Sequence, residues 1–151
     1  MTAGASATIW VPQGDSGDNS DTSLGLRGHF TYKFKEWIAG IGTFDYVFVN
    51  EDSDVDITYY NISVGGRIIK PRPGQIEPYG ELLIGYHVLD IEGADSENTI
   101  GFRLGGGILY PMSQKIQLVA GIAYSTASFD FGLVDVDVDA FVFEVGAAFK
   151  F

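Results

Sequence analysis

The side chains best suited to acid–base chemistry in this sequence are its two histidines, His29 and His87. Hydrolysis with a histidine base needs a nucleophile such as serine within hydrogen-bond reach, and a third group that orients the ring. His29 lies in GHFTY and His87 in GYHVL, and neither segment carries a serine beside the histidine. We therefore interpret both histidines as structural, with catalysis as the minor alternative, and predict no catalytic residue.

Acidic residues form two groups that could attract a metal ion. The run DSDVD at 52–56 has the alternating oxygen ligands of a calcium loop, but Ile57 stands where that loop needs glycine and Ser63 where it needs glutamate. The run DVDVD at 135–139 is explained more simply as a solvated acidic loop than as a metal site. We predict no dedicated metal site and no cofactor, only weak binding of divalent cations by acidic loops.

The elements that position these residues follow from the alternation of apolar and polar residues. In LGLRGHFTYKF (24–34), large apolar residues alternate with glycine and polar residues, which is the two-residue period of a β-strand. The same period recurs along the chain, and no stretch has a helical period. Eight strands are predicted, at 5–12, 24–34, 37–49, 57–69, 78–90, 99–110, 115–125 and 141–151. The direction of Trp10 in the first strand stays open.

The links between these strands alternate in length and charge. The links at 13–23, 50–56, 92–98 and 128–139 hold 14 of the 20 acidic residues and none of the 9 basic ones. The other links, at 35–36, 70–77 and 111–114, are mostly shorter, and four basic residues lie in or beside them: Lys35, Lys70, Arg72 and Lys115. Alternate links of an up-and-down sheet lie at the same end, so one end is predicted to be acidic and the other basic.

Composition narrows the class of protein. The chain has 151 residues, no cysteine and a formal net charge of −11, which excludes disulfides and argues against nucleic acid as a partner, because phosphates repel an acidic surface. No run of 18 apolar residues is present, so no transmembrane helix is predicted. The start, MTAGASATIW, lacks the basic and apolar regions of a signal peptide. We expect a mature form with one domain over residues 1–151.

The apolar face of the strands is predicted to point outwards. Its large side chains would overfill an eight-stranded barrel, whose interior just accommodates side chains. Lipid solvates such residues, and closure of the barrel satisfies every backbone polar group. The glycine-rich polar face then lines the lumen.

Charges buried in so narrow a lumen must pair. From residue counts along the strands, Glu144 is predicted to bridge Arg27 and Arg103 and so to plug the lumen. Arg67 and Glu81 are predicted to form a second pair nearer the basic end. Asp45 lies on the polar face of its strand but is not assigned to these pairs. The ions assigned to the lumen are Arg27, Lys33, Arg67, Glu81, Arg103 and Glu144.

The last strand, FVFEVGAAFKF, ends on an aromatic residue that is preceded by apolar residues at alternate positions. With eight strands and long acidic links, the chain resembles small bacterial outer-membrane β-barrels of the OmpA/OmpX type over essentially its whole length. The resemblance implies an all-β fold, an eight-stranded antiparallel up-and-down transmembrane β-barrel. It also implies a C-terminal insertion signal that is read by the outer-membrane assembly machinery. The members of this signal are Phe143, Val145, Phe149 and Phe151, with Ala147 as a weak member.

This resemblance implies a fold more than a function, because such barrels share topology across many roles. We expect a monomeric, non-enzymatic protein of the bacterial outer membrane that contacts membrane lipid and lipopolysaccharide. Its expected role is structural or in surface interaction, such as adhesion or envelope integrity. The alternatives are a narrow channel for small or apolar solutes and a lipid A-modifying enzyme. The termini and short links are expected to face the periplasm, and the acidic links the exterior.

Overall fold

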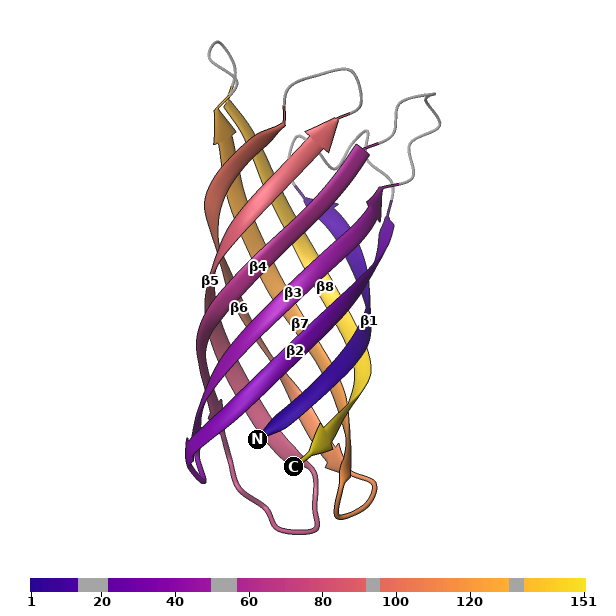
Figure 1. Ribbon diagram of the computed structural model, residues 1–151, viewed down its shortest axis with the longest axis vertical. Coiled ribbons are helices and arrows are strands. Elements are labelled where there is room, and N and C mark those ends of the chain that lie inside the picture. Colours follow the sequence, from indigo (N-terminus) through magenta and orange to yellow (C-terminus); the bar gives the residue numbers. More distant parts are fainter. Residues whose placement is uncertain (14–21, 50–56, 92–95, 131–134) are drawn as a thin grey trace.

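Eight antiparallel strands close into one barrel in chain order, with β1 pairing with both β2 and β8 (Figure 1). The computed structural model describes residues 1–13, 22–49, 57–91, 96–130 and 135–151. The strands are β1 Thr2–Gln13, β2 Ser23–Lys35, β3 Ile38–Val49, β4 Ile57–Ile69, β5 Glu77–Ile91, β6 Glu97–Pro111, β7 Ile116–Asp130 and β8 Asp135–Lys150. The predicted fold class is confirmed. Within the described residues, no helix is long and apolar enough to span a membrane.

Several strand boundaries differ from the sequence prediction. β7 pairs with β8 as far as Asp130 and Asp135, so the long link predicted at 128–139 is wrong. The two strands continue there because ladder hydrogen bonds need only backbone groups, whereas the prediction ended the strands where the apolar alternation weakened. β1 likewise begins at Thr2 rather than at residue 5, and Trp37 lies in a turn before β3.

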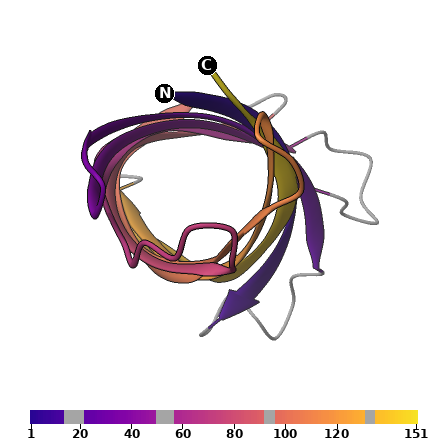
Figure 2. The ribbon, with the colours of Figure 1, turned by 90° about the horizontal axis from the view of Figure 1, so that it is seen from below.

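Both termini lie at one end of the barrel, together with the links β2–β3, β4–β5 and β6–β7 (Figure 1). We call this the terminal end, and the opposite end the acidic end. Figure 2 views the ring of strands from the terminal end. In the β4–β5 link, the Gln75 backbone N–H donates to the Arg72 carbonyl at 2.9 Å, and Gly74 has a φ of 72°. This is a tight turn whose third position needs a backbone conformation with positive φ, which glycine adopts readily.

Side chains alternate between an apolar outer face and a polar lumen. Leu104 is 65% exposed and Val145 68% exposed on the outside, and leucine, isoleucine, phenylalanine and tyrosine residues of every strand share this face. Trp10, whose direction the sequence left open, points inwards and is 4% exposed. The large apolar residues at the alternating outer positions therefore face outwards, as predicted from their volume, and only a smaller set of apolar residues lies in the lumen.

The lumen is filled in layers. Toward the acidic end lies a first apolar cluster of Trp10, Val47, Tyr59, Ala127, Ala140 and Val142. Toward the terminal end lies a second apolar cluster of Ala39, Ile69, Tyr79, Leu109, Val119 and Ala148. Glycines leave space for the larger residues: a Cβ on Gly25 would lie 2.6 Å from the Thr8 hydroxyl, and one on Gly121 would meet the Tyr79 hydroxyl. Buried charges lie between the two clusters.

Candidate functional site

The centre of the lumen holds an ion network built on Arg27. The β2–β3 register places Arg27 directly opposite Asp45, and Arg27 Nε donates to Asp45 Oδ1 at 2.7 Å. Arg27 Nη1 donates to Glu144 Oε2 of β8 at 2.6 Å. Arg27 of β2 is thus joined to β3 on one side and, across β1, to β8 on the other. Both contacts are charge-assisted hydrogen bonds, which are stronger than bonds between neutral groups.

Arg103 of β6 enters the same network through Asp45. Its Nη1 donates to Asp45 Oδ2 at 3.2 Å, and its guanidinium carbon lies 5.1 Å from the centre of the Trp10 ring. The prediction that Glu144 bridges both arginines is therefore wrong for Arg103. Arg27 does contact Glu144, but the carboxylate that accepts from Arg103 is Asp45.

The network is closed to solvent and balanced in charge. Arg27, Asp45, Arg103 and Glu144 are each at most 5% exposed, and two arginines face two carboxylates. Burying an ion is costly unless it is paired and hydrogen-bonded. Arg27 Nη2 and Arg103 Nε and Nη2 have no hydrogen-bond partner among the described residues, so the arginines offer more donors than the two carboxylates accept.

Arg67 and Glu81 form a separate buried pair closer to the terminal end. They are direct cross-strand partners on β4 and β5, and Arg67 Nε and Nη2 donate to Glu81 Oε2 at 3.0 and 2.7 Å. The guanidinium carbon also lies 4.2 Å from the centre of the Tyr79 ring. The contact agrees with the pairing predicted from the sequence. Lys33, which was assigned to the lumen as well, is exposed and lines a cavity at the terminal end.

The two histidines lie in the lumen apart from each other. The Nδ1 atom of His87 shares a hydrogen bond with the Tyr59 hydroxyl. His29 Nδ1 lies 4.0 Å from Glu144 Oε1, and neither of its ring nitrogens has a hydrogen-bond partner among the described residues. No hydrogen bond joins a serine to either histidine in the part of the chain that the structure describes.

The acidic segments lie largely beyond what the structure describes. The run at 52–56 and residues 131–134 are outside it. In the described part of the 135–139 run, Thr126 Oγ1 donates to Asp139 Oδ1 at 2.5 Å and Ser128 Oγ donates to Asp137 Oδ1 at 2.6 Å. Among the described residues, no group of three His, Cys, Asp or Glu is placed to hold a metal ion.

The residues of the predicted C-terminal signal form one outward row. Phe143, Val145, Phe149 and Phe151 are all exposed, and the Phe151 backbone N–H donates to the Met1 carbonyl at 3.0 Å. The row is continuous with the apolar outer face of the barrel.

Sequence reasoning missed Asp45, the carboxylate that holds both arginines, and the Tyr59–His87 contact. A signal for Asp45 existed. A hairpin that turns at 35–36 places residue 45 nearly opposite residue 27, and both residues are on the polar face of their strands. The Tyr59–His87 contact has no comparable signal, because these residues are not directly opposed on β4 and β5: Tyr59 faces Leu89, and His87 faces Asn61.

Comparisons with known proteins agree with this fold. The model of a family described as outer membrane protein beta-barrel domain matches residues 1–151. No curated protein sequence matches the chain. Among solved structures, Neisserial surface protein A is similar with a TM-score of 0.86 and 15% identity, covering 99% of this chain and 96% of that one.

Two further structures share the fold at lower similarity. Ail, the attachment invasion locus protein of Yersinia pestis, has a TM-score of 0.61 and 17% identity, with 99% of this chain and 97% of that chain covered. The outer membrane protein OprG from Pseudomonas aeruginosa has a TM-score of 0.60 and 18% identity, with 99% and 94% covered. Identities this low show a common fold and nothing finer.

Proposed function

This chain belongs to the outer membrane protein beta-barrel domain family, and from that membership we propose that it is a non-conducting outer-membrane protein that acts through its outer surface. The observation that carries the proposal is the filled lumen. An eight-stranded barrel has room for side chains only, and here three layers occupy that room. Toward the acidic end is the first apolar cluster, in the middle the Arg27 network, and toward the terminal end the second apolar cluster.

A barrel without a passage must act at its ends or on its outer wall. The acidic segments singled out in the sequence, 13–23, 50–56, 92–98 and 128–139, carry 14 carboxylates and no basic residue. Such a surface attracts cationic groups over about 8 Å at physiological salt. One structural neighbour, Ail, is named for attachment and invasion. These features support a role in adhesion, with lipopolysaccharide and weakly bound divalent cations as further contacts of the acidic end.

Two measurements test this function together. In planar bilayers the purified protein should give no conductance steps, under conditions in which a porin gives clear steps. Bacteria that display it should adhere to cultured epithelial cells better than the same bacteria carrying a variant with the 14 carboxylates changed to amides. Discrete conductance steps would favour the narrow channel instead. Equal adhesion of the two strains at equal surface amounts would contradict the adhesion role.

We also infer that the chain is not a lipid A-modifying enzyme. A hydrolytic site facing lipid would need a base at the outer surface, whereas His29 and His87 are 6% and 2% exposed inside the lumen. The test is the mass of lipid A from expressing cells. A mass change that disappears in His29→Asn or His87→Asn would contradict the inference.

The outward row at the end of β8 supports a further proposal, that the outer-membrane assembly machinery reads it. Phe151 is 79% exposed, so its removal costs little packing within the barrel. The variant Phe151→Ala should refold in detergent like the parent protein but insert more slowly in cells. Equal amounts of folded protein in the outer membrane at early times after induction would contradict this role.

A further inference from the structure

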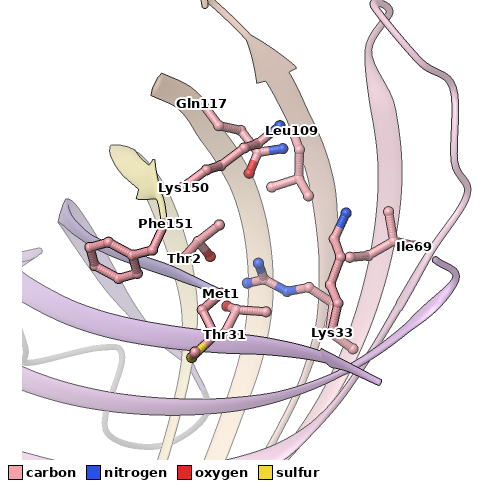
Figure 3. Close-up of a pocket in the computed structure, with 10 residues that line it drawn as sticks. Met1, Thr2, Thr31, Lys33, Ile69, Leu109, Gln117, Lys150 and Phe151 are labelled. Atoms are coloured by element: carbon pink, nitrogen blue, oxygen red, sulfur yellow. The ribbon is translucent and has the colours of Figure 1, made fainter. Parts of the chain in front are cut away.

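A cavity of about 180 Å³ opens at the terminal end of the lumen (Figure 3). Two cross-strand rows on the inner face build it. In one row, Thr2 of β1 lies between Lys150 of β8 and Thr31 of β2. In the other, Ala39 of β3 lies between Lys33 of β2 and Arg67 of β4. Lys150 ends the first row, Lys33 and Arg67 end the second, and all three of these cationic side chains line the cavity.

The side chains that line this cavity carry net positive charge. Three of them are cationic, Lys33, Arg67 and Lys150, and none is acidic. Arg67 is paired with Glu81. Neither Lys33 nor Lys150 has an ion-pair partner among the described residues, so the cavity keeps two uncompensated ammonium groups that line one hollow (Figure 3). Uncompensated positive charges around one hollow favour a bound anion.

Buried polar groups face the same hollow without a partner. Gln117 of β7 and Thr31 of β2 both line the cavity and are each 4% exposed. Gln117 Nε2 and Thr31 Oγ1 have no hydrogen-bond partner among the described residues. Buried donors are almost always satisfied in folded proteins, so an amide and a hydroxyl of this kind point to a ligand that accepts hydrogen bonds.

The cavity ends within the lumen. Ile69 and Leu109 line it, and both belong to the second apolar cluster, where they are 1% and 2% exposed. An anion that enters from the terminal end therefore meets an apolar floor, and the Arg27 network lies beyond it. The cavity can therefore bind a ligand but is not part of a channel through the barrel.

We propose that this cavity is a binding site for a phosphate group at the terminal end of the barrel. Phosphate carries up to two negative charges near neutral pH, which match the two uncompensated lysines, and its tetrahedral oxygens accept hydrogen bonds from several directions. The volume equals about six waters at ~30 Å³ each, room for one phosphate group with some of its hydration. The group can belong to free phosphate or to the headgroup of an anionic phospholipid. This inference is independent of the proposed surface function.

The test uses the whole protein in maltoside micelles, which contain no phosphate. Inorganic phosphate is titrated at constant ionic strength, and binding is followed by ³¹P line width and by the side-chain amide signal of Gln117. A parallel arm uses short-chain phosphatidylglycerol below its micelle concentration. We expect saturable shifts of the Gln117 amide in at least one arm, and the arm that responds identifies the source of the phosphate group.

Two matched double variants decide whether the cavity is responsible. Lys33→Gln with Lys150→Gln should weaken binding at least about tenfold. Lys70→Gln with Lys115→Gln removes the same charge from the same end outside the cavity and should change binding less than about twofold. Equal weakening in both variants would show diffuse attraction by the basic rim and overturn the site. The parent protein alone gives a second test, which does not depend on the folding of a variant. If its Gln117 amide signal shifts in neither arm, the proposed site is overturned as well.

Discussion

Arg27 and Asp45 face each other across the β2–β3 ladder, with Arg27 Nε 2.7 Å from Asp45 Oδ1. The same carboxylate accepts from Arg103 on the opposite wall of the barrel. Asp45 is therefore the one described residue of the network that holds two arginines, and it is fully buried. The network spans the lumen from β8 through β2 and β3 to β6.

Asp45→Asn should destabilise the barrel strongly, because it leaves two buried arginines with one remaining carboxylate, Glu144. Removing one partner of a buried ion pair costs about 3–5 kcal/mol, and less if water enters. Reversible urea unfolding in lipid vesicles measures the loss. Asp90→Asn is the matched control, since Asp90 is exposed on β5 and the change in charge is the same. Equal effects of the two substitutions would show that the network does not stabilise the fold.

Glu144→Gln should destabilise the barrel less than Asp45→Asn, because Glu144 accepts a hydrogen bond from only one of the two arginines, Arg27. The same unfolding assay ranks the two variants. The conductance of the Glu144→Gln variant should remain at background, because the two apolar clusters still close the lumen on either side of the network. Conductance steps that appear only in Glu144→Gln would show that the ion network by itself forms the barrier.

Gly105→Ala should cost about 1–3 kcal/mol, the usual range for overpacking a filled interior. A Cβ at Gly105 would lie 2.6 Å from the Ala123 Cβ and 2.9 Å from the Ile122 carbonyl oxygen, so the β6–β7 backbone must shift. Gly28→Ala is the control, because a Cβ there meets nothing within 4 Å. The thermal midpoint of unfolding in detergent measures both. A larger loss for Gly28→Ala than for Gly105→Ala would contradict the packing of the lumen.

The orientation in the membrane is tested by labelling, which the absence of cysteine makes simple. A membrane-impermeant maleimide added to intact cells should modify Ser53→Cys in the acidic link 50–56. It should leave Gln114→Cys, in the β6–β7 link at the terminal end, unmodified until the outer membrane is opened. These results follow if the terminal end faces the periplasm, as in an even-stranded barrel with short periplasmic turns. The reverse pattern would reject this topology.

The sequence determined the class of fold, because its signal is local. Alternation in a segment such as 24–34 sets which side chains share a face, and only that period decides strand against helix. The volume of the apolar face then decided that it points outwards. The Arg67–Glu81 contact could be predicted for the same reason, because a hairpin places the two residues opposite each other.

Tertiary structure alone decided the partners across the lumen. Arg103 meets Asp45 rather than Glu144 because closure and strand stagger set which groups face each other over the barrel axis, and these depend on all eight ladders together. Trp10 lies in a strand without clean alternation, so its inward direction depends on the registers of β1 with β2 and β8. The phosphate cavity has the same origin: Lys33, Gln117 and Lys150 are far apart in the chain, and only the closed ring brings them to one hollow.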